Sequence, residues 1–243
     1  MSAASLAGLK RLRHASLLVL LYFAPSCLAQ TTAPPNDSFA QTVPFAARLF
    51  YEEAQVLFKA NKPAEGCAKL REALKEFPSY FNALFALASE SYKLGDEQTA
   101  LEMVERARRV NDGDARVYRL FGLIMTGQGK FRLAEFAFRE ALKRDPSHAP
   151  SFQARGVALL ELAKMEKEAP PRAAFLQEAE RALQKALELS QNKLATAHLH
   201  LAGVYEARGE KQQAVRELET YLKERPNAAN AKSVRETIAR LSQ

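Results

Sequence analysis

Residues 129–146 read GKFRLAEFAFREALKRDP, and this stretch carries the pattern that defines the architecture of the chain. Small and aromatic apolar residues recur at helical spacing, at Ala134, Phe138 and Ala141, and charged residues fill the positions between them. Pro146 ends the segment because proline lacks the amide hydrogen that an interior helical position needs. The stretch therefore predicts an amphipathic packing helix rather than a loop that gathers polar groups for catalysis.

The same pattern recurs along the chain at a separation of 34 residues. The segment that starts at Leu87, LASESYKLGDEQTALEMVERARRVND, aligns without gaps with FGLIMTGQGKFRLAEFAFREALKRDP, which starts at Phe121. An upstream copy ends in ALKEFP at Pro78, and LAGVYEARGEKQQAVRELETYLKERP runs from Leu201 to Pro226. A fixed period of this length indicates a stacked array of helical repeats.

Each unit divides into two helices, here called helix A and helix B, around a turn that contains glycine. In the third unit the apolar stripe of helix A consists of Tyr118, Phe121, Gly122 and Met125. We expect Gly122 and Ala134 to let the two helices approach closely, and Phe138 to fill the space that they leave.

These motifs resemble the tetratricopeptide repeat family, whose unit places Leu-Gly, Tyr, Ala, Phe, Ala and Pro at fixed positions. Single positions depart from that pattern, since Gly66 replaces the first Ala of helix B and Asp112 replaces Pro. The resemblance implies an all-α fold, a right-handed superhelical solenoid of helix-turn-helix repeats with a C-terminal capping helix. We expect the repeats at 47–80, 81–114, 115–148, 149–194 and 195–228, and the capping helix at 229–243.

The fourth unit is longer than the family's repeat by 12 residues, since it spans 46 positions rather than 34. We expect Pro170 and Pro171 at the tip of a lengthened helical hairpin, and a long helix B from Arg172 to Ser190. The extension is either a tolerated surface addition with a solvated charged face or an additional docking surface.

The N-terminal residues 1–29 have the composition of a secretory signal peptide. Basic residues are followed by the apolar run ASLLVLLYFA, and small residues precede a cleavage site after Ala29. An uncleaved membrane tether is one alternative. A second is a bacterial lipoprotein lipidated at Cys27, although Ala24-Pro25-Ser26 matches the lipobox of such proteins poorly. Residues 30–46 are rich in Thr and Pro and predict a flexible leader.

The net charge and the cysteine content argue against a nucleic-acid-binding protein and against a reactive thiol. Removing residues 1–29 leaves 32 basic against 28 acidic residues, so the net charge falls from +7 to +4 and gives no case for nucleic-acid binding. The mature chain would contain no integral membrane span. Cleavage would also leave Cys67 as its single cysteine, which we expect to be buried and unreactive.

No catalytic, metal or cofactor site is expected from the residues. His148, His198 and His200 do not share a helical face, and no second cysteine or HExxH motif accompanies them. The run Gly127-Gln128-Gly129-Lys130 lacks the spacing of a phosphate-binding loop. Carboxylates alternate with Lys and Arg at helical spacing, as in Lys185 and Glu188, which favours solvated ion pairs.

The resemblance implies a partner-binding groove on the concave face, lined by the second, fifth, ninth, twelfth and thirteenth positions of each repeat. We predict that this groove is formed by Arg48, Tyr51, Gln55, Phe58, Lys59, Asn82, Phe85, Ser89, Tyr92, Arg116, Arg119 and Leu123. An aromatic floor with basic walls suits an extended or helical peptide that carries acidic groups. Any one of these aromatic residues could instead pack against a neighbouring repeat.

The carboxylate clamp of chaperone-binding relatives is not expected. Tyr51, Gln55, Ala86 and Leu120 stand where that clamp has Lys, Asn, Asn and Arg, and only Arg116 corresponds.

The sequence thus predicts an exported, non-catalytic scaffold in a bacterial periplasm that binds a protein or peptide. One alternative is an envelope lipoprotein anchored through Cys27 that serves outer-membrane or pilus assembly. Another is an accessory subunit that positions a catalytic partner. The sequence indicates neither the partner, nor the biological process, nor an oligomeric state.

Overall fold

The computed structural model describes residues 43–243. The predicted signal peptide, Cys27 and most of the predicted leader lie outside these residues. Within the described range the chain forms eleven α-helices and no strand. They are α1 (Phe45–Lys59), α2 (Pro63–Glu76), α3 (Phe81–Lys93), α4 (Glu97–Val110), α5 (Ala115–Gly127), α6 (Phe131–Arg144), α7 (Ala149–Met165), α8 (Ala169–Ser190), α9 (Ala195–Arg208), α10 (Lys211–Glu224) and α11 (Ala231–Leu241).

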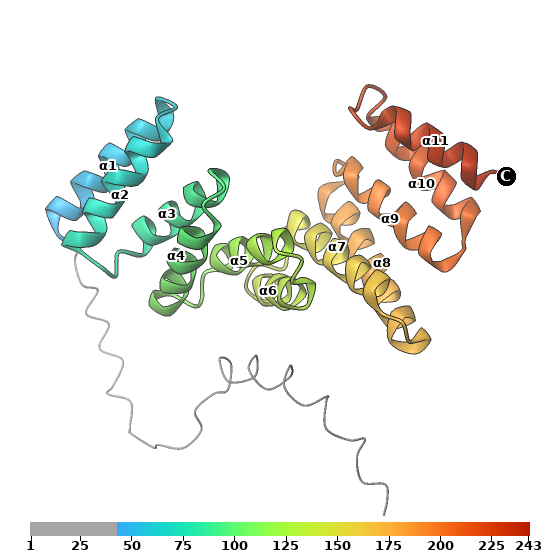
Figure 1. Cartoon of the computed structure of the whole chain (residues 1–243), viewed down its shortest axis with the longest axis horizontal. Coiled ribbons are helices and arrows are strands. Elements are labelled where there is room, and N and C mark those ends of the chain that lie inside the picture. The colour runs from blue at the N-terminus through green and yellow to red at the C-terminus, as the bar shows by residue number, and fades with distance from the viewer. Residues whose placement is uncertain (1–42) are drawn as a thin grey trace, which may run out of the picture. The chain divides into compact units, whose positions relative to one another are not determined.

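The helices pack as consecutive pairs. Each odd-numbered helix from α1 to α9 lies along the even-numbered helix that follows it, and α11 packs on α10 (Figure 1). Successive odd-numbered helices also contact one another from α3 to α9, whereas among residues 43–243 no two even-numbered helices pack to a comparable extent. The odd-numbered helices, which are helices A, therefore line the inner side of the array. The all-α solenoid predicted from the sequence is confirmed.

The backbone repeats its conformation at the turn that follows each of the first three helices A. Asn61, Gly95 and Gly129, which are 34 residues apart, all have positive φ angles of 58°, 79° and 68°. Glycine adopts this region without steric cost, and asparagine tolerates it better than most other residues. The glycines of the repeated pattern are therefore required by the turn, and Asn61 takes the same position in the first pair.

Close helix contacts occur where a glycine faces a large side chain. A Cβ on Gly122 would lie 2.7 Å from the Phe138 ring, and Phe138 is 1% exposed. In the fourth pair Gly156 of helix A faces Leu183 of helix B in the same way, whereas in the first pair the glycine is on helix B, where Gly66 faces Phe58 of helix A. The predicted fit of Gly122 and Phe138 is confirmed, and it makes the core continuous from helix A to helix B.

The fourth pair contains the two longest helices, α7 with 17 residues and α8 with 22. Helix α8 begins at Ala169, three residues earlier than the expected start at Arg172. The correction has a simple cause, because Pro170 and Pro171 lie in the first turn, where the missing amide hydrogens have no partner within the helix. Arg132 of α6 holds the extension, with its guanidinium 5.7 Å from the Phe175 ring and 4.0 Å from Glu166.

The last helix covers the end of the array. Val234 and Leu241 of α11 are buried, and the Tyr221 hydroxyl donates a 2.6 Å hydrogen bond to Asn230 just before the helix. Arg240 forms a 2.7 Å ion pair with Glu206 of α9. In residues 43–243, none of the helices combines the length and the apolar character that a membrane span requires.

Candidate functional site

Aromatic rings from α1 and from the start of α3 form the centre of the candidate site. The Tyr51 ring of α1 lies 5.3 Å from that of Tyr80, which immediately precedes α3. Phe81, the first residue of α3, stacks with Phe85 one turn later, and their ring centres are 6.4 Å apart. These side chains are only partly covered, except for Tyr80, which is buried. They form an apolar strip across the first two helices A.

Helix α5 adds a cation to this strip. The Arg116 guanidinium lies 5.0 Å from the centre of the Phe85 ring and 5.7 Å from that of Phe81. Hydrogen bonds to Asp114 are the main cause of the raised pKa of Arg116, and the nearby Tyr51 contributes to the same shift. Three successive helices A thus bring Tyr51, Phe85 and Arg116 together, and we call this group, with Phe81, the aromatic face.

The arginines of this region already have acidic partners within the chain. Arg116 Nη2 donates to Asp114 Oδ2 at 2.6 Å, and its Nε lies 3.0 Å from both carboxylate oxygens. These bonds hold the pKa of Asp114 below its ordinary value. Arg119 Nη1 donates to Asp145 Oδ2 at 3.1 Å. An acidic ligand would therefore have to compete with Asp114 and Asp145.

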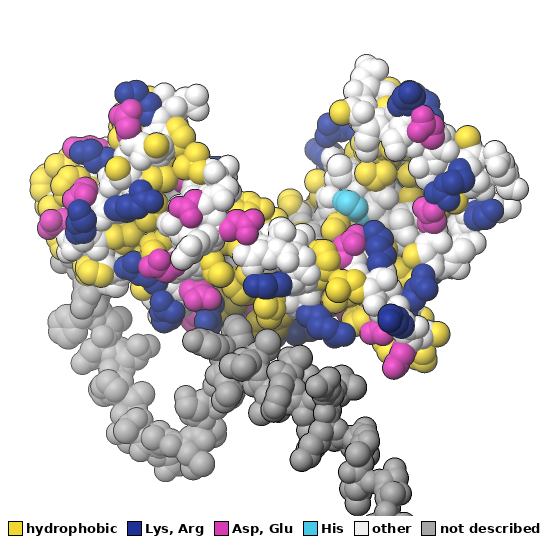
Figure 2. Space-filling view, in the orientation of Figure 1, with side chains coloured by type: hydrophobic (Ala, Val, Ile, Leu, Met, Phe, Trp, Pro, Cys, Tyr) yellow, Lys and Arg dark blue, Asp and Glu magenta, His cyan; other side chains and the backbone are white. Residues whose placement is uncertain are grey.

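The other predicted groove residues have different environments. The Phe58 ring packs over Gly66 between α1 and α2, which is the alternative of packing within the repeats. Tyr92 packs against the first apolar core, as Tyr51, Phe81 and Phe85 also do while staying partly exposed. Arg48, Lys59 and Asn82 are exposed, Leu123 is 41% exposed, and Gln55 and Ser89 are half-buried. Figure 2 shows apolar and basic side chains interspersed over the helices of the first repeats.

Two participants were not predicted from the sequence. Phe81 lies four residues before Phe85, and that spacing on a helix indicates a shared face. Asp114 precedes α5 and accepts a hydrogen bond from the Arg116 amide, which is the ordinary role of aspartate at a helix start. Both patterns were present in the sequence, but the usual groove positions of the repeat include neither residue.

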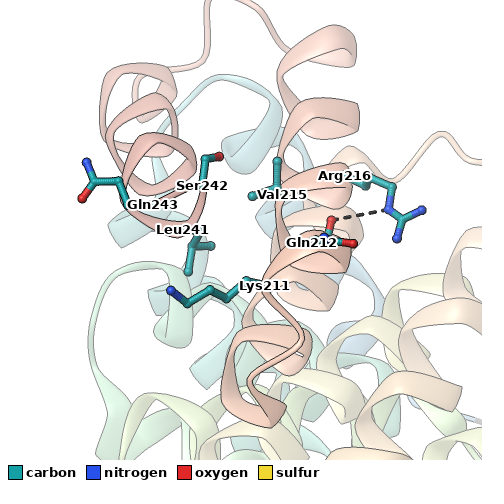
Figure 3. Close-up of a pocket in the computed structure, with 7 residues that line it drawn as sticks. All are labelled: Lys211, Gln212, Val215, Arg216, Leu241, Ser242 and Gln243. Atoms are coloured by element: carbon teal, nitrogen blue, oxygen red, sulfur yellow. Dashed lines mark hydrogen bonds between the residues drawn. The ribbon is translucent and has the colours of Figure 1, made fainter.

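A surface hollow of about 640 Å³ lies at the C-terminal end, between α10 and α11. Its lining consists of Lys211, Gln212, Val215, Arg216, Leu241, Ser242 and Gln243 (Figure 3). The one hydrogen bond drawn there runs from Arg216 Nε to the Gln212 carbonyl oxygen at 3.4 Å, one turn apart on α10. No acid–base pair converges on the hollow, and it shares no residue with the aromatic face.

Three histidines lie within residues 43–243. His148 precedes α7 and accepts a hydrogen bond from the Ser151 amide, and His198 Nδ1 lies 2.6 Å from Glu217 Oε2 across α9 and α10. Burial lowers the pKa of His200. No group of three or more His, Cys, Asp or Glu residues in the described part of the chain is arranged to hold a metal ion. Cys67 is buried as expected, and this burial raises the pKa of its thiol.

The fold is shared with solved structures of low sequence identity. MamA of Desulfovibrio magneticus, residues 41 to the end, is 16% identical with a TM-score of 0.67, covering 77% of this chain and 99% of its own. YrrB, described as a tetratricopeptide repeat protein with an unusual peptide-binding site, is 17% identical with a TM-score of 0.64, covering 78% and 92%. PilF of Pseudomonas aeruginosa is 19% identical with a TM-score of 0.60, covering 81% and 88%.

Two family models match the sequence, whereas none of the curated protein sequences compared with this chain matches it. Residues 51–115 match a tetratricopeptide repeat model. Residues 84–225, more than half of the chain, match the middle tetratricopeptide-repeat-like domain of cilia and flagella-associated protein 70. The first three helix pairs of this chain turn at Asn61, Gly95 and Gly129, which are 34 residues apart, and the chain belongs to the tetratricopeptide repeat family.

Proposed function

We propose that this chain is an exported, non-catalytic scaffold that binds a peptide segment of a protein partner on the aromatic face. The observation that carries the proposal is that Arg116 of α5 lies 5.0 Å from the Phe85 ring of α3, while the Tyr51 ring of α1 lies 5.3 Å from that of Tyr80 just before α3. Aromatic rings supply a large apolar contact area, and aromatic and Arg side chains are enriched in protein interfaces. The twelve groove residues predicted from the sequence and the five repeat boundaries stay predictions.

The contacts at the aromatic face indicate what the partner segment should contain. Arg116 and Arg119 are neutralised by Asp114 and Asp145, so much of the basic wall expected from the sequence has its counter-charge. We therefore propose that apolar or aromatic side chains of the partner contribute most of the binding energy by covering Phe81 and Phe85. The acidic groups expected in the partner stay a prediction, and Arg48 is an exposed cation close to Tyr80 that they could meet.

The unusual peptide-binding site of YrrB is consistent with this mode, although the 17% identity relates only the folds. Membership of the tetratricopeptide repeat family, whose members are generally non-catalytic scaffolds, supports a non-catalytic role for this chain. A protein of this kind would act by bringing partners together.

The experiment that tests this function compares two aromatic residues that each lie under an arginine. Phe85 lies 5.0 Å from Arg116 on the aromatic face, and Phe136 lies 5.7 Å from Arg139 on α6. Phe85→Ala and Phe136→Ala remove the same side chain from comparable settings, so Phe136→Ala is the matched control. We expect pull-downs from an envelope extract, read by quantitative mass spectrometry, to lose the partner with Phe85→Ala only. Equal recovery with both variants would contradict the proposal.

Export and anchoring are proposed from residues 1–29 alone, and intact mass separates the possibilities. Cleavage after Ala29 would give a mature chain that begins at Gln30. Lipidation would instead leave Cys27 as the first residue and add the mass of its acyl chains. We expect the first result, in the periplasmic fraction, and retention of residues 1–26 would contradict both forms of processing.

A further inference from the structure

The first helix exposes the face that each later helix A buries. With the repeats aligned as predicted, the third position holds Leu49, Ala83, Val117, Ser151 and Ala197. Leu49 is 42% exposed, whereas the other four are at most 2% exposed. The tenth position behaves in the same way, because Val56 is 65% exposed while Ile124, Ala158 and Val204 are fully buried. Glu90, the remaining residue at this position, is half-buried.

The difference follows from stacking. Helices α3, α5, α7 and α9 each pack against helix B of the preceding pair, and α1 has no preceding pair among the described residues. Phe45, which is 73% exposed, extends the same face, because residues 45, 49, 52 and 56 follow helical spacing. Figure 2 shows apolar side chains gathered at the end of the molecule where α1 lies. We call Phe45, Leu49, Glu52 and Val56 the uncapped face.

At the C-terminal end of the array, the last helix pair is covered by a helix with a charged outer surface. Helix α11 covers the last pair with Val234 and Leu241, and its exposed positions include Lys232, Arg235, Glu236 and Arg240. Terminal units of repeat proteins need such a polar outer surface for solubility. The uncapped face lacks one, so its large apolar side chains indicate that another helix covers it.

Two occupants fit poorly. Residues 30–42 contain Pro34-Pro35, and Phe39 is their only large apolar residue, so their sequence has no apolar stripe that matches the uncapped face. The C-terminal end of a second copy presents the charged surface of α11, which would leave charges buried against Val56 and Phe45. A head-to-tail filament is therefore disfavoured by the asymmetry of the two ends.

We propose that two copies of the chain associate head to head through their uncapped faces. Arg48 and Glu52 are exposed, and within residues 43–243 neither forms an ion pair. An antiparallel pair of α1 helices that crosses midway between them brings Arg48 of each copy beside Glu52 of the other, and Phe45 toward Val56. Such a two-fold contact is self-complementary in charge and in apolar surface, and it closes without further growth.

Sedimentation velocity of the full chain over a concentration series tests the proposal. We expect a reversible monomer–dimer equilibrium that Val56→Glu shifts toward monomer by at least about tenfold in Kd, because two charges would enter an apolar contact. Met165→Glu is the matched control, since Met165 is 66% exposed on α7, and it should dimerise like the parent. A monomeric parent, or a Val56→Glu variant that dimerises equally well, would overturn the proposal. Circular dichroism verifies that the variants fold.

A charge exchange makes the test specific for the two-fold arrangement. In a dimer of the Arg48→Glu variant, the new glutamate of each copy would face Glu52 of the other copy with like charge. In a dimer of the Glu52→Arg variant, the new arginine of each copy would likewise face Arg48 of the other. Each variant should therefore dimerise about tenfold more weakly, while an equimolar mixture should recover a dimer that contains one copy of each. Failure of the mixture to associate better than either variant alone would overturn the proposed register. Association driven by the apolar run at 15–24 would survive all of these changes and would also overturn it.

Discussion

At Gly122 the third pair of helices comes so close together that a single additional carbon has no space. The three nearest atoms to a Cβ at this position all belong to the Phe138 ring, and that ring is almost completely buried. Gly127, which ends the same helix, differs because only the Glu97 carboxylate lies near, at 3.9 Å. Replacing each glycine with alanine removes the same backbone freedom, but only at Gly122 does the added carbon clash with a packed ring. Comparing the two substitutions therefore separates the effect of packing from that of backbone freedom.

We expect Gly122→Ala to lower the free energy of unfolding by about 1–3 kcal/mol, because the Phe138 ring must leave its buried position. Gly127→Ala should leave stability unchanged or raise it by up to about 1 kcal/mol, as alanine favours the helix. Urea unfolding of both variants provides the measurement. Equal destabilisation by the two substitutions would show that the contact with Phe138 is not the cause.

Ionisation of the Tyr205 hydroxyl should make the stability of the fold depend on pH in the alkaline range. Burial, together with the hydrogen bond that its hydroxyl donates to Glu180, raises its pKa from about 10 to about 12. The folded state therefore keeps a proton that the unfolded state has lost between these pH values. The free energy of unfolding should fall by up to about 2 kcal/mol as the pH rises from 10 to 12.

The difference between the parent and Tyr205→Phe isolates this contribution, because all other groups titrate in both proteins. We expect the variant to be less stable near neutral pH and the gap to close above pH 11, as followed by denaturant unfolding. A gap that stays constant up to pH 12 would contradict the role of the Tyr205 proton.

Ion partners show why the candidate site could be predicted only in part at this scale. The pattern of the repeat predicts Tyr51, Phe85 and Arg116 as groove residues, because position within a helix decides which side of the array a side chain faces. It did not locate the partners Asp114 and Asp145, because these pairs depend on how side chains lie at helix ends and between neighbouring repeats. The sequence predicts basic walls, and the structure shows that two of their arginines, Arg116 and Arg119, are ion-paired within the chain.

At the scale of elements, the hairpin of α7 and α8 departs most from the repeated unit. Its tip extends beyond the common length, and Phe175 near the start of α8 packs under Arg132 of α6. Farther along, Glu180 accepts hydrogen bonds from Tyr205 and Arg208 of α9, so the second half of α8 has contacts on both sides. The two halves of this helix should therefore differ in local stability.

We expect Phe175→Ala to speed amide hydrogen exchange in residues 169–178 while residues 179–190 keep their protection, because the tip loses its contact with α6 and the rest of α8 does not. Exchange followed by mass spectrometry measures both segments in one sample. Loss of protection along the whole helix would instead mean that α8 unfolds as a single unit.

The helices could be predicted from the sequence wherever the helical spacing of apolar residues agrees with the positions of turn glycines and prolines. The turn glycines at Gly95 and Gly129 and the small residues at Gly122 and Ala134 define both the helices and their contact. The start of α8 was expected three residues too late, because two prolines in a row were assigned to the turn although both fit the first turn of a helix. The sequence pattern could not decide between these two places.

At the scale of the whole molecule, the proposed function requires that the partner lies on the aromatic face and not on the extended hairpin. The chain carries probes for both surfaces. Tyr51 and Phe85 are partly exposed on the aromatic face, and Met165 is 66% exposed where α7 ends. All three side chains react with hydroxyl radicals when water reaches them, so one experiment reports on both surfaces.

Hydroxyl-radical footprinting of the protein with and without its captured partner distinguishes these two surfaces in a single measurement. We expect the partner to reduce the oxidation of Tyr51 and Phe85 and to leave that of Met165 unchanged. Reduced oxidation of Met165, with Tyr51 and Phe85 as reactive as in the free protein, would contradict binding on the aromatic face.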